Sequence, residues 1–283
     1  MERAAMLDLR EQSIPDVLEK CRKALDVEFN DDIPAFGWGG KSVGFETSRG
    51  TWVKILSRAA GSINERTWTG EECSSVLSGV SKPKLLRSIR WSDDDRGVVW
   101  RADETTLVSF SIVSSTPEIR NDSPGLSDAW WSDLRESLAA LARHRTTRVG
   151  VRQDLINRRI REFAGDAIDS SVDEWTTAHA DVHWANLTAP TLVLLDWEGW
   201  GLGPRGLDAA TLWVFSLLAP PVAEKVSHEF SEDLSSRSGK IAQLFMCVEL
   251  LKMVRDFGDH PDMEKPLARE ADRLTIELSG PMR

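Results

Sequence analysis

The spacing of a few polar residues constrains this chain more than any other feature. His179, Asp181 and Asn186 follow one another in the order H-x-D-x-x-x-x-N. An apolar run over residues 192–195 then ends on Asp196. The pattern predicts a loop that carries a carboxylate and an amide, followed by a buried strand that ends in a second carboxylate. Phosphoryl transfer from a nucleotide uses such a set, because one carboxylate orients the acceptor hydroxyl while the amide and the other carboxylate hold Mg²⁺.

These residues and a segment that follows them resemble the catalytic and metal loops of the aminoglycoside phosphotransferase family. The family pattern is H-G-D-L-x-x-x-N, then a strand ending in I-D-W or I-D-F, then G-x-P-x-x-D-L-A. Here the segments are H-A-D-V-H-W-A-N at 179–186, L-D-W-E at 195–198, and G-P at 203–204 followed by D-A-A at 208–210. Ala180 departs from the usual glycine, a change that would tighten the loop but removes no reactive group.

The resemblance implies a role for each polar residue of this stretch. Asp181 would be the catalytic base, and Asn186 and Asp196 would bind Mg²⁺. Asp208 would brace the catalytic loop. His179 would belong to the catalytic set by holding the loop in place, without acting as the base.

The resemblance also implies an α+β, protein-kinase-like fold in two lobes. Residues 1–104 would form a small nucleotide-binding lobe with a five-stranded antiparallel sheet and one main helix. Residues 105–283 would form a larger, mostly helical lobe for catalysis and acceptor binding. Apolar residues recur at helical spacing in four segments of this lobe, namely 207–218, 222–234, 241–257 and 267–278.

A glycine-rich turn lies between two expected strands near the N-terminus. Residues 36–44 read FGWGGKSVG, and we expect Gly39, Gly40 and Ser42 to contact phosphates, since glycine lets backbone N–H groups approach closely. This is not a Walker A loop, because no G-K-[ST] opens a helix after a strand. A hairpin turn then leads into a strand that carries Lys54, which the resemblance makes the nucleotide-phosphate lysine.

A predicted helix over residues 62–79 supplies a partner for this lysine. The fold calls for a helical glutamate that pairs with Lys54, and the spacing favours Glu72, with Glu71 as the alternative. A solvated helix surface is the simpler interpretation of both glutamates.

The expected hinge between the lobes follows the last strand of the first lobe. This strand, residues 97–102, runs into Asp103 and Glu104. In the family, the backbone at this point meets the edge of the base. The identity of the side chains says little about a contact made by the backbone, so the base can be adenine or guanine. ATP and GTP both remain possible cofactors beside Mg²⁺.

Three tryptophans stand in or beside the catalytic and metal loops, and two interpretations remain open for them. They would form an aromatic wall for the acceptor, or they would pack in the core beneath the loops. They are Trp184, Trp197 and Trp200.

Composition restricts the partners. A net charge of −10 argues against general nucleic-acid binding and is compatible with a cationic small-molecule acceptor. No apolar run is long enough to cross a bilayer, and the N-terminus has no apolar signal region. Cys21, Cys73 and Cys247 form no metal spacing and suggest a reducing, cytoplasmic location.

The sequence therefore predicts a nucleotide-dependent kinase that phosphorylates a hydroxyl group of a small molecule, such as an aminoglycoside, another antibiotic or a metabolite. Two alternatives share the same residues: a kinase that acts on Ser or Thr of a peptide, and a nucleotide-binding protein without catalytic activity. The retained base, metal ligands and lysine count against the last of these.

Overall fold

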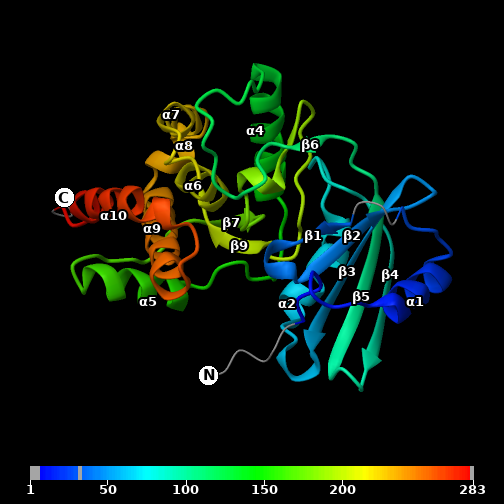
Figure 1. Ribbon diagram of the computed structural model, residues 1–283. Helices are drawn as coiled ribbons and strands as arrows, with labels where there is room; N and C mark the ends of the chain where they lie inside the picture. Colours follow the sequence, from blue (N-terminus) through cyan, green and yellow to red (C-terminus); the bar gives the residue numbers. More distant parts are fainter. Residues whose placement is uncertain (1–6, 31–33, 281–283) are drawn as a thin grey trace. The chain divides into compact units, whose positions relative to one another are not determined.

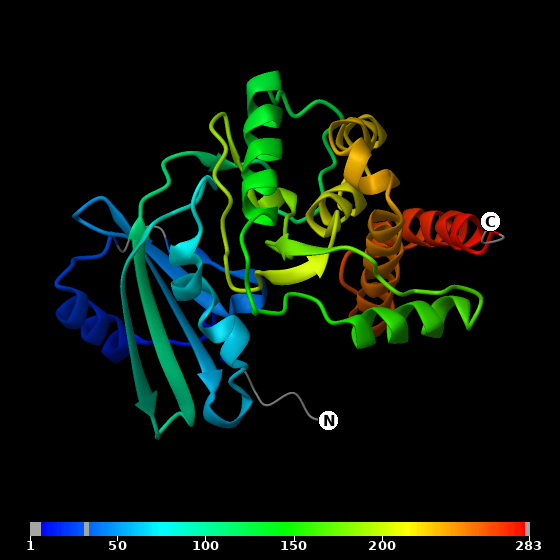
Figure 2. The ribbon, with the colours of Figure 1, turned by 180° about the vertical axis from the view of Figure 1, so that it is seen from behind.

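The computed structural model describes residues 7–30 and 34–280, and its contacts divide the chain into two compact units. The first unit comprises Met1–Ser75 and Lys82–Ser109, and the second comprises Val76–Ser81 and Phe110–Arg283. The boundary expected at residue 104 thus falls inside a strand, five residues before the end of the first unit. Figures 1 and 2 show the elements from opposite sides, and each unit is described here by itself.

The first unit is built on a five-stranded sheet in the order β1-β2-β3-β5-β4. Every neighbouring pair in this order is antiparallel, as predicted. The strands are β1 (Ala35–Phe36), β2 (Ser42–Glu46), β3 (Thr51–Ala59), β4 (Leu85–Asp93) and β5 (Val98–Thr106).

One helix, α1 (Pro15–Leu25), shares a core with this sheet. Its buried residues recur every four positions, which places them on one side of the helix. In β3, Val53 and Ile55 are fully buried in the same core. Because side chains alternate along a strand, Lys54 between them lies on the opposite face of the sheet. The helix contributes Val17, Cys21 and Leu25 to the core, and the other strands contribute Val43, Phe45, Val98, Trp100 and Ala102.

The single helix expected over residues 62–79 is wrong. The structure has two one-turn helices, α2 (Glu65–Trp68) and α3 (Gly70–Cys73), followed by the 3₁₀ turn η3 (Ser74–Val76). The break comes at Thr69, whose φ and ψ of −102° and 2° are not helical, directly before Gly70. Glycine is a poor helix former, so the chain does not propagate one helix through this point.

The second unit is mostly helical, and its long helix α9 packs against α5, α6, α8 and α10. The four helical segments predicted after residue 206 are present. Two small antiparallel sheets accompany the helices: β6 (Ser111–Ile112) with β8 (Thr188–Ala189), and β7 (Trp175–Ala178) with β9 (Gly201–Pro204). The helices are α4 (Asp128–Ala142), α5 (Gln153–Ala164), α6 (Leu207–Val214), α7 (Pro220–Glu229), α8 (Ser231–Ser235), α9 (Arg237–Phe257) and α10 (Glu264–Leu278).

Within residues 7–30 and 34–280, no helix has the length and apolar character that a membrane span requires.

Candidate active site

The loop with the H-x-D motif begins where β7 ends, and a carboxylate from α6 holds its start. Asp208, in the first turn of α6, accepts hydrogen bonds from the backbone N–H groups of His179 and Ala180, both at 2.8 Å. Burial raises the pKa of Asp208 to about 6, although these two bonds act in the opposite direction. Asp208 therefore fixes the backbone immediately before Asp181.

His179 connects this loop to the segment before Asp196. Its Nε2 lies 3.0 Å from the carbonyl oxygen of Leu195, and its ring meets the edge of Trp197 with centroids 4.5 Å apart. A carbonyl can only accept, so Nε2 carries the ring proton. Burial lowers the pKa of His179 to about 4, which keeps the ring neutral. A fully enclosed, neutral ring of this kind suits a brace and not a base.

Two residues of the site have left-handed backbone conformations. The φ angle is 66° at Ala180 and 63° at Asp196. Only glycine adopts this region at no cost, which explains why glycine is usual at position 180 in the resembled family. An alanine here costs about 1 kcal/mol. One strained residue directly precedes Asp181 and the other is Asp196 itself, and such conformations commonly cluster at functional sites.

Asn186, in the 3₁₀ turn η4 (Trp184–Asn186), is held with its amide nitrogen toward the catalytic loop. Nδ2 lies 3.0 Å from the carbonyl oxygen of Asp181, 3.3 Å from Oδ2 of Asp181 and 3.1 Å from Nε2 of His183. Because Nδ2 can only donate, Oδ1 faces away from these groups and is placed to bind a cation. The N–H of Leu195 donates to the carbonyl oxygen of Asn186 at 2.9 Å, so the two predicted metal ligands come from adjoining segments.

The electrostatics around Asp181 favour a bound cation. The protein atoms packed around Asp181, and then the negative charge of Asp196, raise the pKa of Asp181 to about 7, although 49% of its side chain is exposed and the hydrogen bond from Asn186 opposes the rise. The charge of Glu198 adds to it. A divalent cation would relieve this repulsion. No three His, Cys, Asp or Glu side chains in the described ranges converge on a preformed metal cage. One amide and one carboxylate fit Mg²⁺, which keeps waters and takes substrate phosphates as its other ligands.

The strand expected over residues 192–195 is wrong, and its predicted burial holds for Leu192 and Leu194 but not for Val193 and Leu195, which are half-buried. Leu192 and Leu194 are each 1 % exposed, but the segment forms only an isolated bridge between Leu187 and Leu194. Its N–H groups donate elsewhere, that of Leu194 to the carbonyl oxygen of Ser81 at 2.9 Å. The segment thus delivers Asp196 as an extended, buried chain without belonging to a sheet.

The tryptophans near the loops belong to the core. Trp184 and Trp197 are fully buried and Trp200 is 2 % exposed, so none forms a wall open to an acceptor. The Trp184 ring stacks on Trp130, and its Nε1 donates to Oγ of Ser216 at 3.0 Å. Of the two interpretations left open by the sequence, core packing is the one that the structure supports.

In the first unit, Glu72, the expected partner of Lys54, binds an arginine. The carboxylate of Glu72 binds Arg90 of β4. Lys54 is half-buried and stands opposite Asp103 in the register of β3 and β5. Burial lowers the pKa of Lys82, and the charge of Glu71 opposes this change. Glu72 thus has Arg90 as a partner, and its pairing with Lys54 stays a prediction.

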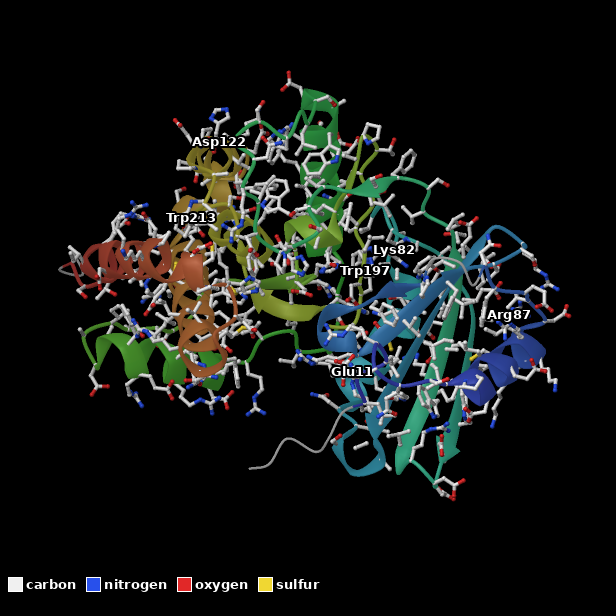
Figure 3. All side chains as sticks on the ribbon, in the orientation of Figure 1. Glu11, Lys82, Arg87, Asp122, Trp197 and Trp213 are labelled. Atoms are coloured by element: carbon white, nitrogen blue, oxygen red, sulfur yellow. The ribbon has the colours of Figure 1, made fainter. Side chains whose placement is uncertain are left out.

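Asp103 and Glu104 also need correction, because they lie inside the sheet and not at its exit. β5 pairs with β3 and β4 on its two sides through this region. Asp103 binds Nε of Arg101 at 2.8 Å, both side chains being buried. Glu104 binds Nε of Arg87, labelled in Figure 3, at 2.6 Å. These carboxylates stabilise the sheet, and the chain leaves it only after Thr106.

The glycine-rich turn has one exposed glycine, Gly39, and one buried glycine, Gly40. Gly39 and Gly40 have φ angles of 63° and 67°, as expected for a tight turn. The N–H of Leu9 donates to the carbonyl oxygen of Gly40 at 2.8 Å, and a Cβ on Gly40 would lie 1.8 Å from a carboxylate oxygen of Asp8. Ser42 is 9 % exposed and pairs with Leu56 of β3. The N-terminal segment thus packs directly on this turn.

Sequence reasoning missed two parts of the second unit. His183 contacts Asn186 and lies 3.6 Å from Oδ1 of Asp181, and burial lowers its pKa to about 4. Its position inside the motif was the available signal. Glu118, 4 % exposed, meets Nδ1 of His260 at 2.9 Å. No sequence pattern joins those two residues.

Comparison with protein-family models gives no match, and comparison with curated proteins gives none either.

Solved structures do share the fold. The apo form of a thermostable mutant of aminoglycoside phosphotransferase APH(4)-Ia has a TM-score of 0.64 at 11% identity, covering 93% of this chain and 100% of that one. Amicoumacin kinase hAmiN, in complex with AMP-PNP, Ca²⁺ and Ami, gives 0.60 at 12% identity, covering 94% of each chain. The streptomycin–ATP complex of APH(2″)-IIa gives 0.57 at 11% identity, covering 91% of this chain and 95% of that one. The predicted α+β, kinase-like fold is confirmed.

Proposed function

We propose that this protein is an O-phosphotransferase that moves the γ-phosphate of ATP to a hydroxyl group of a small molecule. The observation that carries the proposal is the arrangement of Asp181 and Asn186. The amide nitrogen of Asn186 holds Asp181, and its oxygen is left for a cation beside the segment that delivers Asp196. This is the constellation that phosphoryl transfer needs.

Each residue has a defined part in the reaction. Lys54 contributes positive charge to the nucleotide phosphates. Asp181 accepts the proton of the acceptor hydroxyl as the oxygen of that hydroxyl bonds to the γ-phosphorus. The bond from that phosphorus to the β–γ bridging oxygen breaks, and ADP leaves. Mg²⁺, held by Asn186 and Asp196, would neutralise the phosphate charge.

The residues around the base position it without reacting. Asp208 fixes the backbone before Asp181, and His179 ties the loop to Leu195. Such positioning accounts for much of the catalysis of phosphoryl transfer, because the transition state requires little covalent help from the protein.

A small acceptor is supported by the neighbours that share the fold. Structures of APH(4)-Ia hold hygromycin B, and that of APH(2″)-IIa holds streptomycin. The net charge of −10 suits a cationic acceptor of this kind, and the three free cysteines suit a reducing cytoplasm. ATP is the better choice of nucleotide, because the ligands of these neighbours include AMP-PNP, ADP and ATP.

A nucleotide-consumption screen tests the proposal. Wild type and Asp181→Asn would be incubated with Mg²⁺–ATP and aminoglycosides, other hydroxylated antibiotics, amino alcohols or Ser/Thr peptides. We expect ADP formation by the wild type alone, stimulated by a small acceptor, with the phosphate located on that acceptor by ³¹P NMR. Stimulation by peptides only would instead support a peptide kinase.

A further inference from the structure

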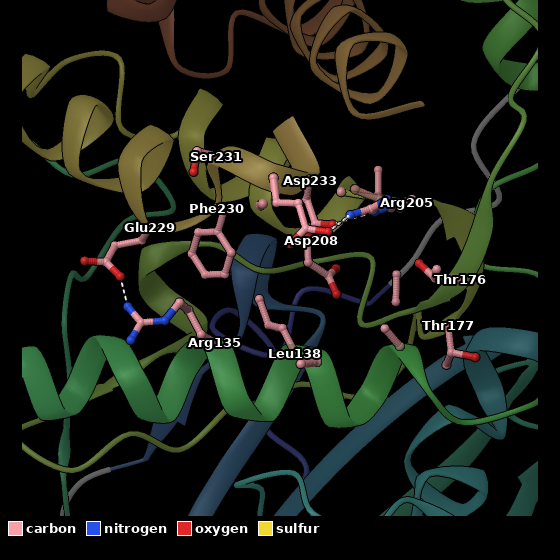
Figure 4. Close-up of a pocket in the computed structure, with 17 residues that line it drawn as sticks. Arg135, Leu138, Thr176, Thr177, Arg205, Asp208, Glu229, Phe230, Ser231 and Asp233 are labelled. Carbon is pink, nitrogen blue, oxygen red and sulfur yellow. Dashed lines mark hydrogen bonds and ion pairs between the residues drawn. The ribbon is translucent and has the colours of Figure 1, made fainter. Parts of the chain in front are cut away.

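A cavity of about 460 Å³ opens within the second unit, on one side of Asp208 (Figure 4). Its walls come from α4, β7, the start of α6 and the junction of α7 with α8. Small side chains leave the space, since four alanines line it besides larger apolar groups. The apolar lining includes Leu138, Ala139, Ala142, Ala178, Leu207 and Phe230.

The volume is that of a small-molecule site. Cavities that bind ligands commonly measure about 300–1,000 Å³, with apolar walls and a few polar groups that fix orientation. Here charged groups stand at the two ends, and Leu138 and Phe230 lie between them (Figure 4). One end offers the spare donors of an arginine, and the other has an excess of carboxylates.

At one end an arginine lines the cavity. Glu229, with a side chain only 8% exposed, binds both Arg135 and Lys225, the latter at 2.5 Å. Lys225 also lies 3.9 Å from Asp128, so the charges of this end balance. Glu229 is the only ion-pair partner that the described chain gives Arg135, whose guanidinium has five N–H donors and whose side chain is 41% exposed. The remaining donors are suited to bind a carboxylate.

The other end has an excess of negative charge. Arg205 binds Asp233 at 2.7 Å, Glu232 at 2.8 Å and Glu174 at 3.1 Å. Three carboxylates thus surround a single guanidinium. Glu232 and Asp233 both line the cavity, so this end is suited to bind an ammonium group.

The spacing of the lining residues sets the length of a matching ligand. Arg135 and Ala142 of α4 both line the cavity, and seven residues of α-helix rise about 10 Å. A tripeptide in extended conformation covers a similar length, at about 3.3–3.6 Å per residue.

We propose that this cavity is a binding site for a linear zwitterion with an apolar centre, of tripeptide length. The carboxylate of the ligand binds Arg135, its apolar centre packs on Leu138 and Phe230, and its ammonium group faces Glu232 and Asp233. Such a ligand also lies against Asp208, whose carboxylate holds the N–H groups of the catalytic loop. Binding is therefore linked to the order of that loop.

Calorimetry with the full chain tests the site, with the tripeptide Ala-Leu-Ala as probe. We expect saturable binding with a Kd of about 1 mM or below. N-acetylation or C-amidation of the probe, each of which removes one charge, should weaken binding at least about tenfold. The absence of saturable binding, or equal binding of all three probes, would overturn the proposal.

Two variants and a matched control locate the binding. Arg135→Gln should weaken binding at least about tenfold, because it removes the charge that faces the carboxylate. Ala139→Leu should weaken it by filling the cavity while keeping every charge. Arg143→Gln changes an exposed arginine just after the same helix that does not line the cavity, and should leave binding unchanged. Unchanged affinity in both Arg135→Gln and Ala139→Leu would place the peptide elsewhere.

Hydrogen exchange tests the link to the catalytic loop without any acceptor, so it does not depend on the proposed function. Saturating Ala-Leu-Ala should change the protection of the N–H groups of His179 and Ala180 in the wild type but not in Arg135→Gln. Binding without a change in this protection would overturn the link.

Discussion

The loop around Asp181 in the second unit and the five-stranded sheet with its adjoining helices in the first unit differ in how their charged side chains are paired. In the loop, Asp181, Asn186 and His183 contact one another, and buried partners hold the backbone. In the first unit, Glu72 of α3 and Glu104 of β5 bind arginines of β4. Negative charge is concentrated around Asp181 in the loop, whereas the carboxylates of Glu72 and Glu104 are paired with arginines. The predictions below test this difference.

The largest expected effect is on the base itself. Asp181→Asn keeps the shape and one acceptor oxygen but removes the charge, and should lower kcat by about 10²–10⁴-fold with nucleotide affinity nearly unchanged. Steady-state kinetics on the acceptor identified by the screen measure this. His179→Gln is the companion variant: near-normal turnover of Asp181→Asn beside a folded but inactive His179→Gln would reverse the two roles.

In the first unit, Lys54→Ala and Glu72→Gln should differ in their effects on ATP turnover. Lys54→Ala should reduce ATP turnover at least about tenfold, because it removes a charge that meets the phosphates. Glu72→Gln should change turnover by less than about threefold, since Glu72 binds Arg90 and its pair is an exposed one. Equal losses in both variants would show that the two residues act as a pair during turnover.

The pH dependence should reveal the crowded charge of the loop. Asp181 must be ionised to accept a proton, so activity should fall as pH drops through its pKa, which lies near 7 without a cation. Saturating Mg²⁺ favours the charged form and should move this acid limb to lower pH. Glu198→Gln removes one source of the raised pKa and should move the limb the same way. A limb that does not respond to Mg²⁺ or to this variant would count against the electrostatic account.

The smallest expected effect is a gain in stability. Ala180→Gly relieves the left-handed conformation at φ 66° and should raise the free energy of unfolding by about 0.5–1 kcal/mol. Urea denaturation measures it. Gly206→Ala places alanine at another left-handed position, φ 82°, and should shift stability in the opposite direction.

These contrasts also explain what the sequence could predict. Asp181 and Asn186 are close together in the sequence, and the motif predicts that they share one loop. The structure brings them into contact in that loop. The antiparallel sheet and the mostly helical second unit followed from the resemblance, and hydrophobic spacing located the helical segments after residue 206. The pairing of Glu72 with Arg90 could not be predicted from the sequence, because it depends on packing between α3 and β4. The strand expected at 192–195 failed because burial shows in the sequence, whereas hydrogen bonds to distant residues such as Ser81 do not.

The central claim is that Asn186 and Asp196 hold a metal–nucleotide complex beside Asp181. Calorimetric titration of ATP, with and without Mg²⁺, into wild type and Asp196→Ala tests it most directly. The account predicts that Mg²⁺ tightens ATP binding to the wild type and has no such effect on Asp196→Ala, with both proteins folded by circular dichroism. Equal affinity for ATP with and without Mg²⁺ in the wild type would contradict it.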